Sequence, residues 1–375
     1  MPQRTDKKTI CLNMIVKNES AIIRDTLENI ISHVPLDYYV ISDTGSDDNT
    51  ADIIKQFFDE KGIQGEIHHD EWVNFAHNRN CALQHAQGKT DYVLIFDADD
   101  RFEGTFELPE ELTSDRYYFR MANSVTGANV YFRTLMFRND GSFYWRGVLH
   151  EFVEQRKETV VEQKIFGDYY VISGRFGARS NNPQKYFQDA QVLEKAFYSP
   201  EDEDLKDRYA FYTAQSYRDA DMYEKAIEWY AIRANLGGWS EEVYYSFLQI
   251  ALLKIELNAS LNEIQNLLLS TYEYRPQRAE SLYHLARQLR HHNKARLAYI
   301  YATVAANIPL SKDILFVDHS VYEWKAKEEL AISANSVGNY QLCHDLCVEL
   351  LFNPAVPEPN RKLLLDNLKL AKEYL

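Results

Sequence analysis

Three carboxylates follow a short apolar run in the first third of the chain. Residues 92–96 read Tyr-Val-Leu-Ile-Phe, and Asp97, Ala98, Asp99 and Asp100 come directly after them. Such a run is typical of a buried strand of a parallel sheet, and ligands of open α/β sheets bind outside the carboxyl ends of these strands. Clustered carboxylates repel one another unless a cation neutralises them. Asp97 and Asp99 therefore indicate a Mg²⁺ or Mn²⁺ site, with a simple acidic turn as the alternative.

Two more polar turns follow predicted strands. Val16, Asn18 and Glu19 lie at the first turn, and Asp43 opens the second, over residues 43–50. Neither turn is a Gly-rich phosphate loop. A strand-end aspartate can accept the N–H of a nucleotide base or a ribose hydroxyl, which suits Asp43. The alternative for Asp43 is capping of the next helix, a role that Ser, Asp or Thr residues of the same turn could also fill.

Two polar clusters complete the set of candidate residues. Asn74, His77 and Arg79 lie at the start of a predicted helix, where an anion is favoured. Arg79 can pair with a diphosphate or brace Asp97, and a surface helix cap is the alternative. Further on, the imidazole of His150 is a suitable Mn²⁺ ligand, and the adjacent Glu151 could accept a proton. Taken alone, such a histidine is more often a packed core residue.

The elements that must position these residues alternate between strand and helix. Strand patterns occupy residues 9–16, 38–42 and 64–69, and helical patterns occupy 18–32, 51–60 and 77–87. This alternation predicts an α/β domain whose parallel sheet has helices on both faces. Aromatic, β-prone runs follow at 116–121, 129–137, 143–145 and 169–172. We expect them to be added strands that extend the sheet and wall the site.

Helical periodicity replaces the strand pattern after about residue 184. Residues 207–239 resemble a tetratricopeptide repeat, with two short helices, a small residue at their crossing and aromatic residues in the groove. Weaker echoes pair residues 279–290 with 295–307 and 323–337 with 340–351. The predicted domains are therefore 1–183, α/β, and 184–375, an all-α helical-repeat array.

Composition limits the partners and the compartment. A chain of 375 residues with 45% hydrophobic residues is expected to form two domains. Its formal net charge of −15 argues against nucleic acid and against an anionic membrane surface. No apolar stretch is long enough for a membrane span. The four cysteines are scattered, so we expect a reducing, cytoplasmic compartment, and Cys343 and Cys347 are interpreted as core residues rather than metal ligands.

The order of these motifs resembles family 2 glycosyltransferases of the GT-A fold. The resemblance covers roughly residues 8–180 and is carried by the segments 13–19, 43–50, 74–80, 96–99 and 150–151. The helical repeats resemble those of a subgroup in which a tetratricopeptide-like region follows the transferase. The resemblance implies a metal-dependent transfer of a sugar from a nucleotide-sugar donor, with UDP as the expected carrier, to a glycan or a protein or peptide acceptor. It implies a Mn²⁺ or Mg²⁺ cofactor.

Each implied role can be placed on this sequence. Asp43 would read the base, Asp97 would hold ribose and metal-bound water, Asp99 would coordinate the metal and His150 would complete its sphere. The full implied donor-binding set is Val16, Asn18, Glu19, Asp43, Arg79, Asp97 and Ala98. An inverting reaction needs a carboxylate base, yet the usual later base motif is absent. Glu151 is the first candidate for the base, with Asp140 and Asp168 in reserve.

Two alternative functions stay open at this point. The chain could be an interaction scaffold whose repeats do the work beside a degenerate transferase half. The second alternative is a nucleotidyltransferase. Such an enzyme would need a Gly-rich loop with a Lys, but Lys17, the candidate, has no glycines around it. In the transferase interpretation, the helical region would position an acceptor or form a homodimer.

Overall fold

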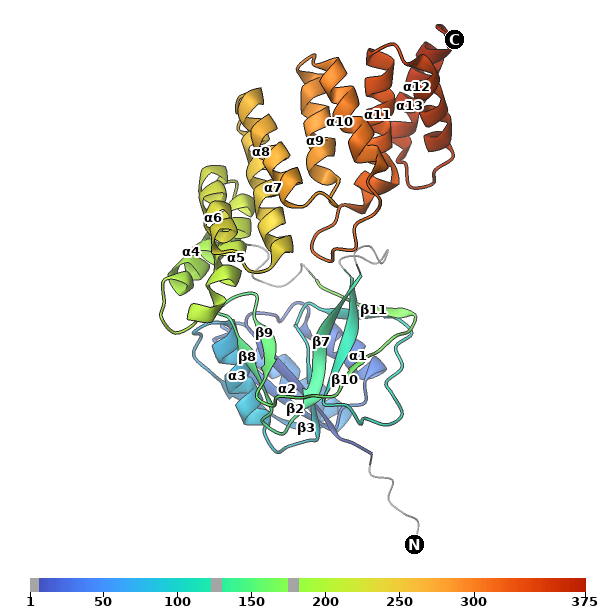
Figure 1. Cartoon of the computed structure of the whole chain (residues 1–375). Helices are drawn as coiled ribbons and strands as arrows, with labels where there is room; N and C mark the ends of the chain where they lie inside the picture. Colours follow the sequence, from blue (N-terminus) through green and yellow to red (C-terminus); the bar gives the residue numbers. More distant parts are fainter. Residues whose placement is uncertain (1–6, 123–129, 175–181) are drawn as a thin grey trace. The chain divides into compact units, whose positions relative to one another are not determined.

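A computed structural model describes residues 7–122, 130–174 and 182–375 of the chain (Figure 1). These residues form two compact units, the first ending at Asp202 and the second beginning at Glu203. The first unit contains the sheet and also α4 (Lys185–Phe197), a helix that lies beyond residue 183, where the sequence pattern changes. The second unit is helical.

A mixed sheet forms the centre of the first unit, in the order β3-β2-β1-β4-β7-β6-β11-β5, with β10 beside β6. Strands β1 to β4 pair in parallel, whereas β7 runs antiparallel to both β4 and β6. The strands are β1 (Ile10–Val16), β2 (Tyr38–Asp43), β3 (Gln64–His69), β4 (Tyr92–Ile95), β5 (Arg101–Gly104), β6 (Arg116–Ala122), β7 (Tyr131–Arg138), β10 (Glu162–Lys164) and β11 (Tyr169–Ile172).

Alternating side chains of the parallel strands build a core on each face of the sheet. On one face Leu12 and Leu94 join a cluster with residues of α1 (Ile23–His33) and α2 (Thr50–Lys61). On the other face Val40 and Val93 pack with residues of α3 (Phe75–Ala86). Helices therefore cover both faces, as the strand-helix alternation predicts.

The aromatic runs after residue 115 confirm the expected extra strands, with one correction. β6, β7 and β11 extend the main sheet, but β8 (Phe143–Arg146) pairs with β9 (Phe152–Gln155) in a separate two-stranded sheet. β8 is separate because Phe143 and Trp145 bury their rings in the core beside α3, together with Phe137 of β7. β8 therefore does not lengthen the main sheet.

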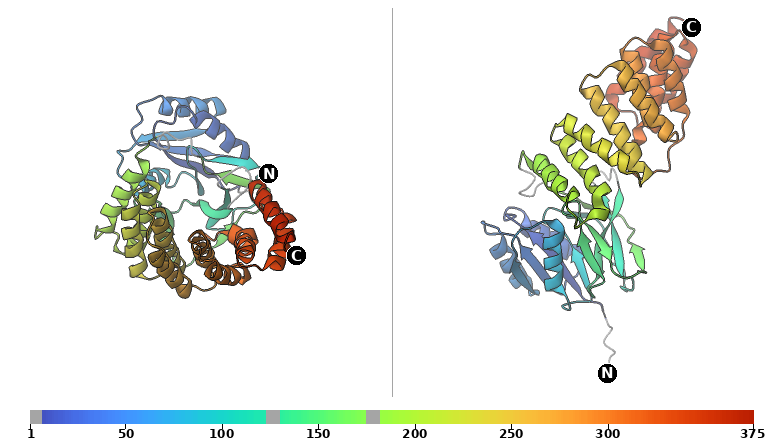
Figure 2. Two further views of the ribbon diagram at one scale, coloured as in Figure 1. Left: turned by 90° about the horizontal axis from the view of Figure 1, so that it is seen from above. Right: turned by 60° about the vertical axis from the view of Figure 1, so that its left-hand side comes forward.

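The helices of the second unit follow one another as neighbours along the chain, α5 against α6, α6 against α7 and so on to α13 (Figure 2). This serial packing is typical of helical repeats. The helices are α5 (Lys206–Asp219), α6 (Tyr223–Leu236), α7 (Ser240–Glu256), α8 (Leu261–Tyr274), α9 (Glu280–His291), α10 (Ala295–Asn307), α11 (Ala326–Ser336), α12 (Tyr340–Leu351) and α13 (Glu358–Lys372). Cys343 and Cys347 lie in the buried core of the last helices, as predicted.

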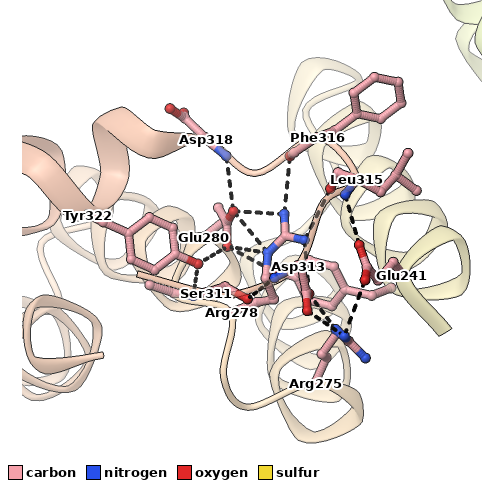
Figure 3. A network of polar contacts seen from close by, with 12 residues as sticks. Glu241, Arg275, Arg278, Glu280, Ser311, Asp313, Leu315, Phe316, Asp318 and Tyr322 are labelled. Carbon is pink, nitrogen blue, oxygen red and sulfur yellow. Dashed lines mark hydrogen bonds and ion pairs between the residues drawn. The ribbon is translucent and has the colours of Figure 1, made fainter. Parts of the chain in front are cut away.

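Irregular residues 308–318, here called the strap, join α10 to a helical segment that begins at residue 319 and continues through the turn Val321–Lys325. Side chains of other elements bond its backbone (Figure 3). Glu241 accepts the amides of residues 314 and 315, and Arg278 donates to the carbonyls of residues 315 and 316. Arg278 is fully buried against Glu280. The strap is thus fixed to the helices by a buried ion network.

Candidate active site

The parallel strands carry the polar turns to a single edge of the sheet. Val16, the last residue of β1, is the register partner of Asp43, the last residue of β2. β4 pairs with β1 on the other side and is followed by Asp97. Because the carboxyl ends of these strands meet at this edge, three of the sequence-predicted turns are brought together.

Side chains of the second turn bond the backbone of the first. The amide of Asn18 donates to Ser46 Oγ (3.0 Å), and that of Glu19 donates to Thr50 Oγ1 (2.8 Å). Asn18 itself has a positive φ of 57° and accepts the amide of Asp47. These hydrogen bonds join the two turns into one loop layer, and the contacts of Asn18 and Glu19 in it are structural.

Asp43 is buried and organises its own turn. Its Oδ1 accepts the amides of Gly45 (3.0 Å) and Ser46 (2.8 Å), and its Oδ2 lies 3.8 Å from Nδ1 of the exposed His69. Capping of α2 falls instead to Asp48, whose Oδ1 accepts the amide of Thr50. Burial opposes ionisation of Asp48, but hydrogen bonds from Thr50 and Ser20 lower its pKa to about 2. The helix-capping alternative for Asp43 is therefore not what the structure shows.

Arg79 braces Asp97, one of its two sequence-predicted roles. Its Nη2 lies 2.6 Å from Asp97 Oδ1 and its Nε lies 2.6 Å from Glu151 Oε1. The guanidinium is stacked on the ring of Trp145, 4.9 Å from its centroid, and only 6% of the side chain is exposed. Burial disfavours its charge, but Asp97 and Glu151 outweigh burial and raise the pKa of Arg79.

Arg133 of β7 is a second arginine at Asp97 that the sequence analysis missed. Both of its Nη atoms lie 3.3 Å from Asp97 Oδ2. Burial raises the pKa of Asp97, but Arg79 and Arg133 outweigh it and hold that pKa well below its usual range. One signal was available: a lone cation inside the apolar, aromatic run of residues 131–137. Only the register of β7 against β4 reveals its partner.

Asp100 also belongs to the site, although the sequence indicated only a turn residue. It is 1% exposed, and among the residues that the structure describes neither carboxyl oxygen meets a donor at full hydrogen-bond geometry, although Ser173 and Arg133 lie close enough to stabilise its charge. Burial, and then the charge of Asp97, raise its pKa to about 8. Burial disfavours the ionised form of this carboxyl, so a cation bound close to the turn would stabilise the ionised form.

The backbone of the acidic turn is held from two sides. Thr26 Oγ1 of α1 donates to the carbonyl of Ala98 (2.6 Å), and Asn29 bonds both backbone groups of Phe102. On the other side Gly174 packs so closely that an added Cβ would lie 1.8 Å from the Asp99 carbonyl oxygen. Ala98 is therefore a buried residue whose backbone is fixed in position by Thr26.

The loop after β8 brings Glu151 to the site. Glu151 is joined to Asp97 through Arg79. His150 is exposed and has a positive φ of 54°, so it is not the packed core residue that a lone histidine suggests. Positive φ is uncommon for a residue with a side chain and is found at functional loops. Asn74 caps α3 by accepting the amide of His77, which is itself exposed.

Two predicted residues lie elsewhere. Asp140 follows β7 at the amino end of β4, since Asn139 donates to Asp91, and its carboxylate is paired with Lys157 at 2.8 Å. Asp168 precedes β11 beside Gly104, at the end of the β5–β11 pair that is distant from Asp100. Neither carboxylate joins the Asp97 cluster, because the antiparallel strands carry both to other edges.

A divalent metal site needs several hard oxygen or imidazole ligands close together. Among the residues that the structure describes, no group of three or more His, Cys, Asp or Glu side chains is arranged as a metal centre. Asp97 has each oxygen held by an arginine. The half-buried Asp99 and the buried Asp100 nevertheless provide the hard oxygen donors that Mg²⁺ and Mn²⁺ prefer. The donor chemistry fits such a cation.

One family model matches a segment of the first unit. Residues 11–112 match the model of glycosyl transferase family 2. No curated protein matches the chain. None of the helices in the described residues is both long and apolar enough to cross a bilayer. The matched segment contains Asp43, Arg79, Asp97 and Asp99.

Among solved structures, TarS residues 1–349 from S. aureus is similar at 15% identity and a TM-score of 0.38, covering 72% of this chain and 92% of that chain. The same fragment in complex with UDP-GlcNAc gives 14% identity, a TM-score of 0.36 and coverages of 72% and 93%. MamA AMB-1 is similar at 15% identity and a TM-score of 0.31, covering 51% and 89%.

Proposed function

Because the chain carries a family 2 glycosyltransferase domain, we propose that it transfers a sugar from a nucleotide-sugar donor to a glycan, protein or peptide acceptor, with inversion at the anomeric carbon. UDP is the proposed carrier. The observation that carries this proposal is the acidic turn at the carboxyl end of β4, where two arginines bind Asp97 and the carboxyl of Asp100 is buried.

The donor would lie across the edge formed by the ends of β1, β2 and β4. Asp43 would accept a hydrogen bond from the base through Oδ2, since its Oδ1 is occupied by the amides of its own turn. The loop layer containing Val16, Asn18 and Glu19 would lie against the nucleoside and support it. Asp97 would take the ribose side of the site, held in place by Arg79.

The proposed cofactor is Mn²⁺ or Mg²⁺. Asp99 would be its main ligand, with His150 from the loop after β8 and the neighbouring carboxyl groups of the turn. When bound, such a cation neutralises the negative charge of the leaving diphosphate. The buried carboxyl of Asp100 supports this assignment, because a nearby cation would compensate the negative charge that burial disfavours.

Glu151 is the proposed base of the three candidates, since it alone belongs to the Asp97 network. Its carboxylate would accept the proton of the acceptor hydroxyl as the oxygen attacks the anomeric carbon. Asp140 and Asp168 lie at other edges of the sheet, where they make local structural contacts, so neither is proposed as the base. The helical unit would position the acceptor or form a homodimer.

A thermal-shift panel tests the proposal. Sugar nucleotides with uracil, guanine and thymine bases would be added to the whole chain with and without Mn²⁺. A ligand that binds only the folded chain raises its melting temperature, so at least one donor should raise it only when Mn²⁺ is present. The scaffold alternative predicts no shift with any donor, and that result would reject the transferase proposal.

A further inference from the structure

The two arginines at Asp97 are not equivalent. Arg79 makes short contacts of 2.6 Å to two different carboxylates, stacks on Trp145 and is 6% exposed. Arg133 makes two longer contacts of 3.3 Å and its side chain is 29% exposed. Arg79 is therefore built into the structure, whereas Arg133 is loosely held at the solvent side.

The pairing of Arg133 is also incomplete. A guanidinium binds best when two of its N–H groups meet two oxygens of one acceptor. Here both Nη atoms of Arg133 share the single Oδ2 of Asp97, because Oδ1 is taken by Arg79. The fork of Arg133 thus has no second acceptor oxygen at Asp97, and a better partner can compete for it.

The position of Arg133 faces the proposed donor site. Leu94 of β4 is the register partner of Met136 of β7, so three residues further on β7 reaches Arg133 as β4 reaches Asp97. Tyr131, two residues before Arg133 and therefore on the same face of the strand, is 43% exposed. This end of β7 consequently offers a cation and an aromatic ring beside the acidic turn.

The geometry points to Arg133 as a ligand of the donor diphosphate that moves from Asp97 to the phosphates when the donor binds. This inference rests on the proposed function and names a residue for its diphosphate subsite. Two non-bridging phosphate oxygens would give the fork the bidentate partner that Asp97 cannot give. Asp97 keeps Arg79 throughout, so the turn does not lose its only cation.

A ligand series isolates the diphosphate contribution. Binding of uridine, UMP and UDP to the whole chain would be measured by calorimetry with Mn²⁺, together with the guanosine series in case the base is guanine. The wild-type chain should bind the diphosphate more tightly than the nucleoside. Arg133→Gln should reduce affinity for the diphosphate by about 10- to 100-fold and leave the nucleoside affinity within about 2-fold.

Two further variants serve as controls for the Arg133→Gln result. Arg133→Lys keeps a cation at Asp97 but cannot fork, so it should keep the melting temperature of the free chain and still lose part of the diphosphate increment. Arg120→Gln removes an arginine from the neighbouring strand β6, where the guanidinium lies over the Tyr170 ring, and should leave the series unchanged.

The outcomes separate the two proposals. If the wild-type chain binds no diphosphate of either base, the proposed function fails. If wild-type binds UDP or GDP and Arg133→Gln keeps the full increment over the nucleoside, Arg133 is not a diphosphate ligand. An equal loss for nucleoside and diphosphate would likewise overturn the inference, because it would make Arg133 only a static partner of Asp97.

Discussion

Asp97 and Glu151 are two carboxylates held by one buried guanidinium. Breaking a buried ion pair by removing one partner leaves a charge without compensation, which costs about 3–5 kcal/mol. Arg79→Met keeps the volume and removes the charge, so it should lower the free energy of unfolding by about that amount, as measured by urea denaturation of the first unit. Asp97 would keep only the longer contacts to Arg133.

Arg24→Met is the matched control. Arg24 pairs with Glu60 on the surface, with both side chains more than two-fifths exposed, and exposed pairs contribute little. Its unfolding curve should almost coincide with the wild-type curve. If Arg79→Met also unfolds like wild-type, the Asp97–Arg79–Glu151 network does not hold the site together.

Sequence reasoning identified candidate residues that stand in a recognisable local pattern and missed those brought in by strand pairing. Asp97 and Asp99 follow an apolar strand, and that pattern is visible in the sequence. Arg133 contacts Asp97 only because β7 runs antiparallel to β4, a pairing across 36 residues that no local motif encodes. Asp100 looks like any turn residue until its burial is known.

At the level of elements, the strap shows how an irregular segment can be fixed. Its backbone is held by side chains of other elements: Glu241, Arg278 and Glu280 bond five backbone groups of residues 314, 315, 316 and 318. Arg278→Met should therefore lower the free energy of unfolding of the helical unit by about 3–5 kcal/mol, since it leaves Glu280, 2% exposed, without its cation.

Lys254→Met is the control for that experiment. Lys254 pairs with Glu263 at a third to two-fifths exposure, and we expect little change in stability. Urea denaturation followed by circular dichroism measures both variants, since the second unit is helical. Equal stability of the two variants would mean that the strap is not anchored by the ion network.

α9 carries a histidine whose titration should make the helical unit sensitive to acid. Burial, and then the charge of Arg287, lower the pKa of His284 to about 4, while Asp318 acts in the opposite direction and Lys325 adds to the lowering. Between pH 6.5 and 4 the unfolded chain binds a proton that the folded chain does not, so stability falls as the pH falls. Above pH 6.5 this effect vanishes.

His284→Gln should remove that part of the pH dependence. The melting temperature of the variant should fall less than that of wild-type between pH 6.5 and pH 4.5, corresponding to about 1–3 kcal/mol of free energy. His292→Gln, at an exposed position after α9, is the comparison. Parallel curves for wild-type and His284→Gln would contradict the assigned pKa.

Element types followed from hydrophobic periodicity wherever a segment was long. The helices at 280–291, 295–307 and 340–351 coincide closely with the predicted pairs. The short strands β5, β9 and β10 were missed because charged residues interrupt their apolar pattern, whereas the equally short β4 and β11 are apolar and aromatic throughout. The predicted helix from residue 18 begins only at Ile23, because residues 18–20 are bonded to the second turn.

On the scale of the whole molecule, the question is what the helical unit does for the transferase. We predict that a chain ending at Asp202, the last residue of the first compact unit, keeps donor hydrolysis and loses most transfer to an acceptor. The physical reason is that all the proposed donor-binding residues lie within the first unit. Comparison of hydrolysis and transfer rates of the two chain lengths measures this. An equal loss of both activities would make the helical unit a structural support.

Binding of a nucleotide-sugar donor together with a divalent cation at the turn after β4 can be measured by calorimetry of the whole chain and of Asp99→Ala. Titration with the donor identified by the thermal-shift panel, with and without Mn²⁺, should show Mn²⁺-dependent binding to wild-type and none to Asp99→Ala, at an unchanged melting temperature of the free chains. Unchanged Mn²⁺-dependent binding by Asp99→Ala would contradict the account.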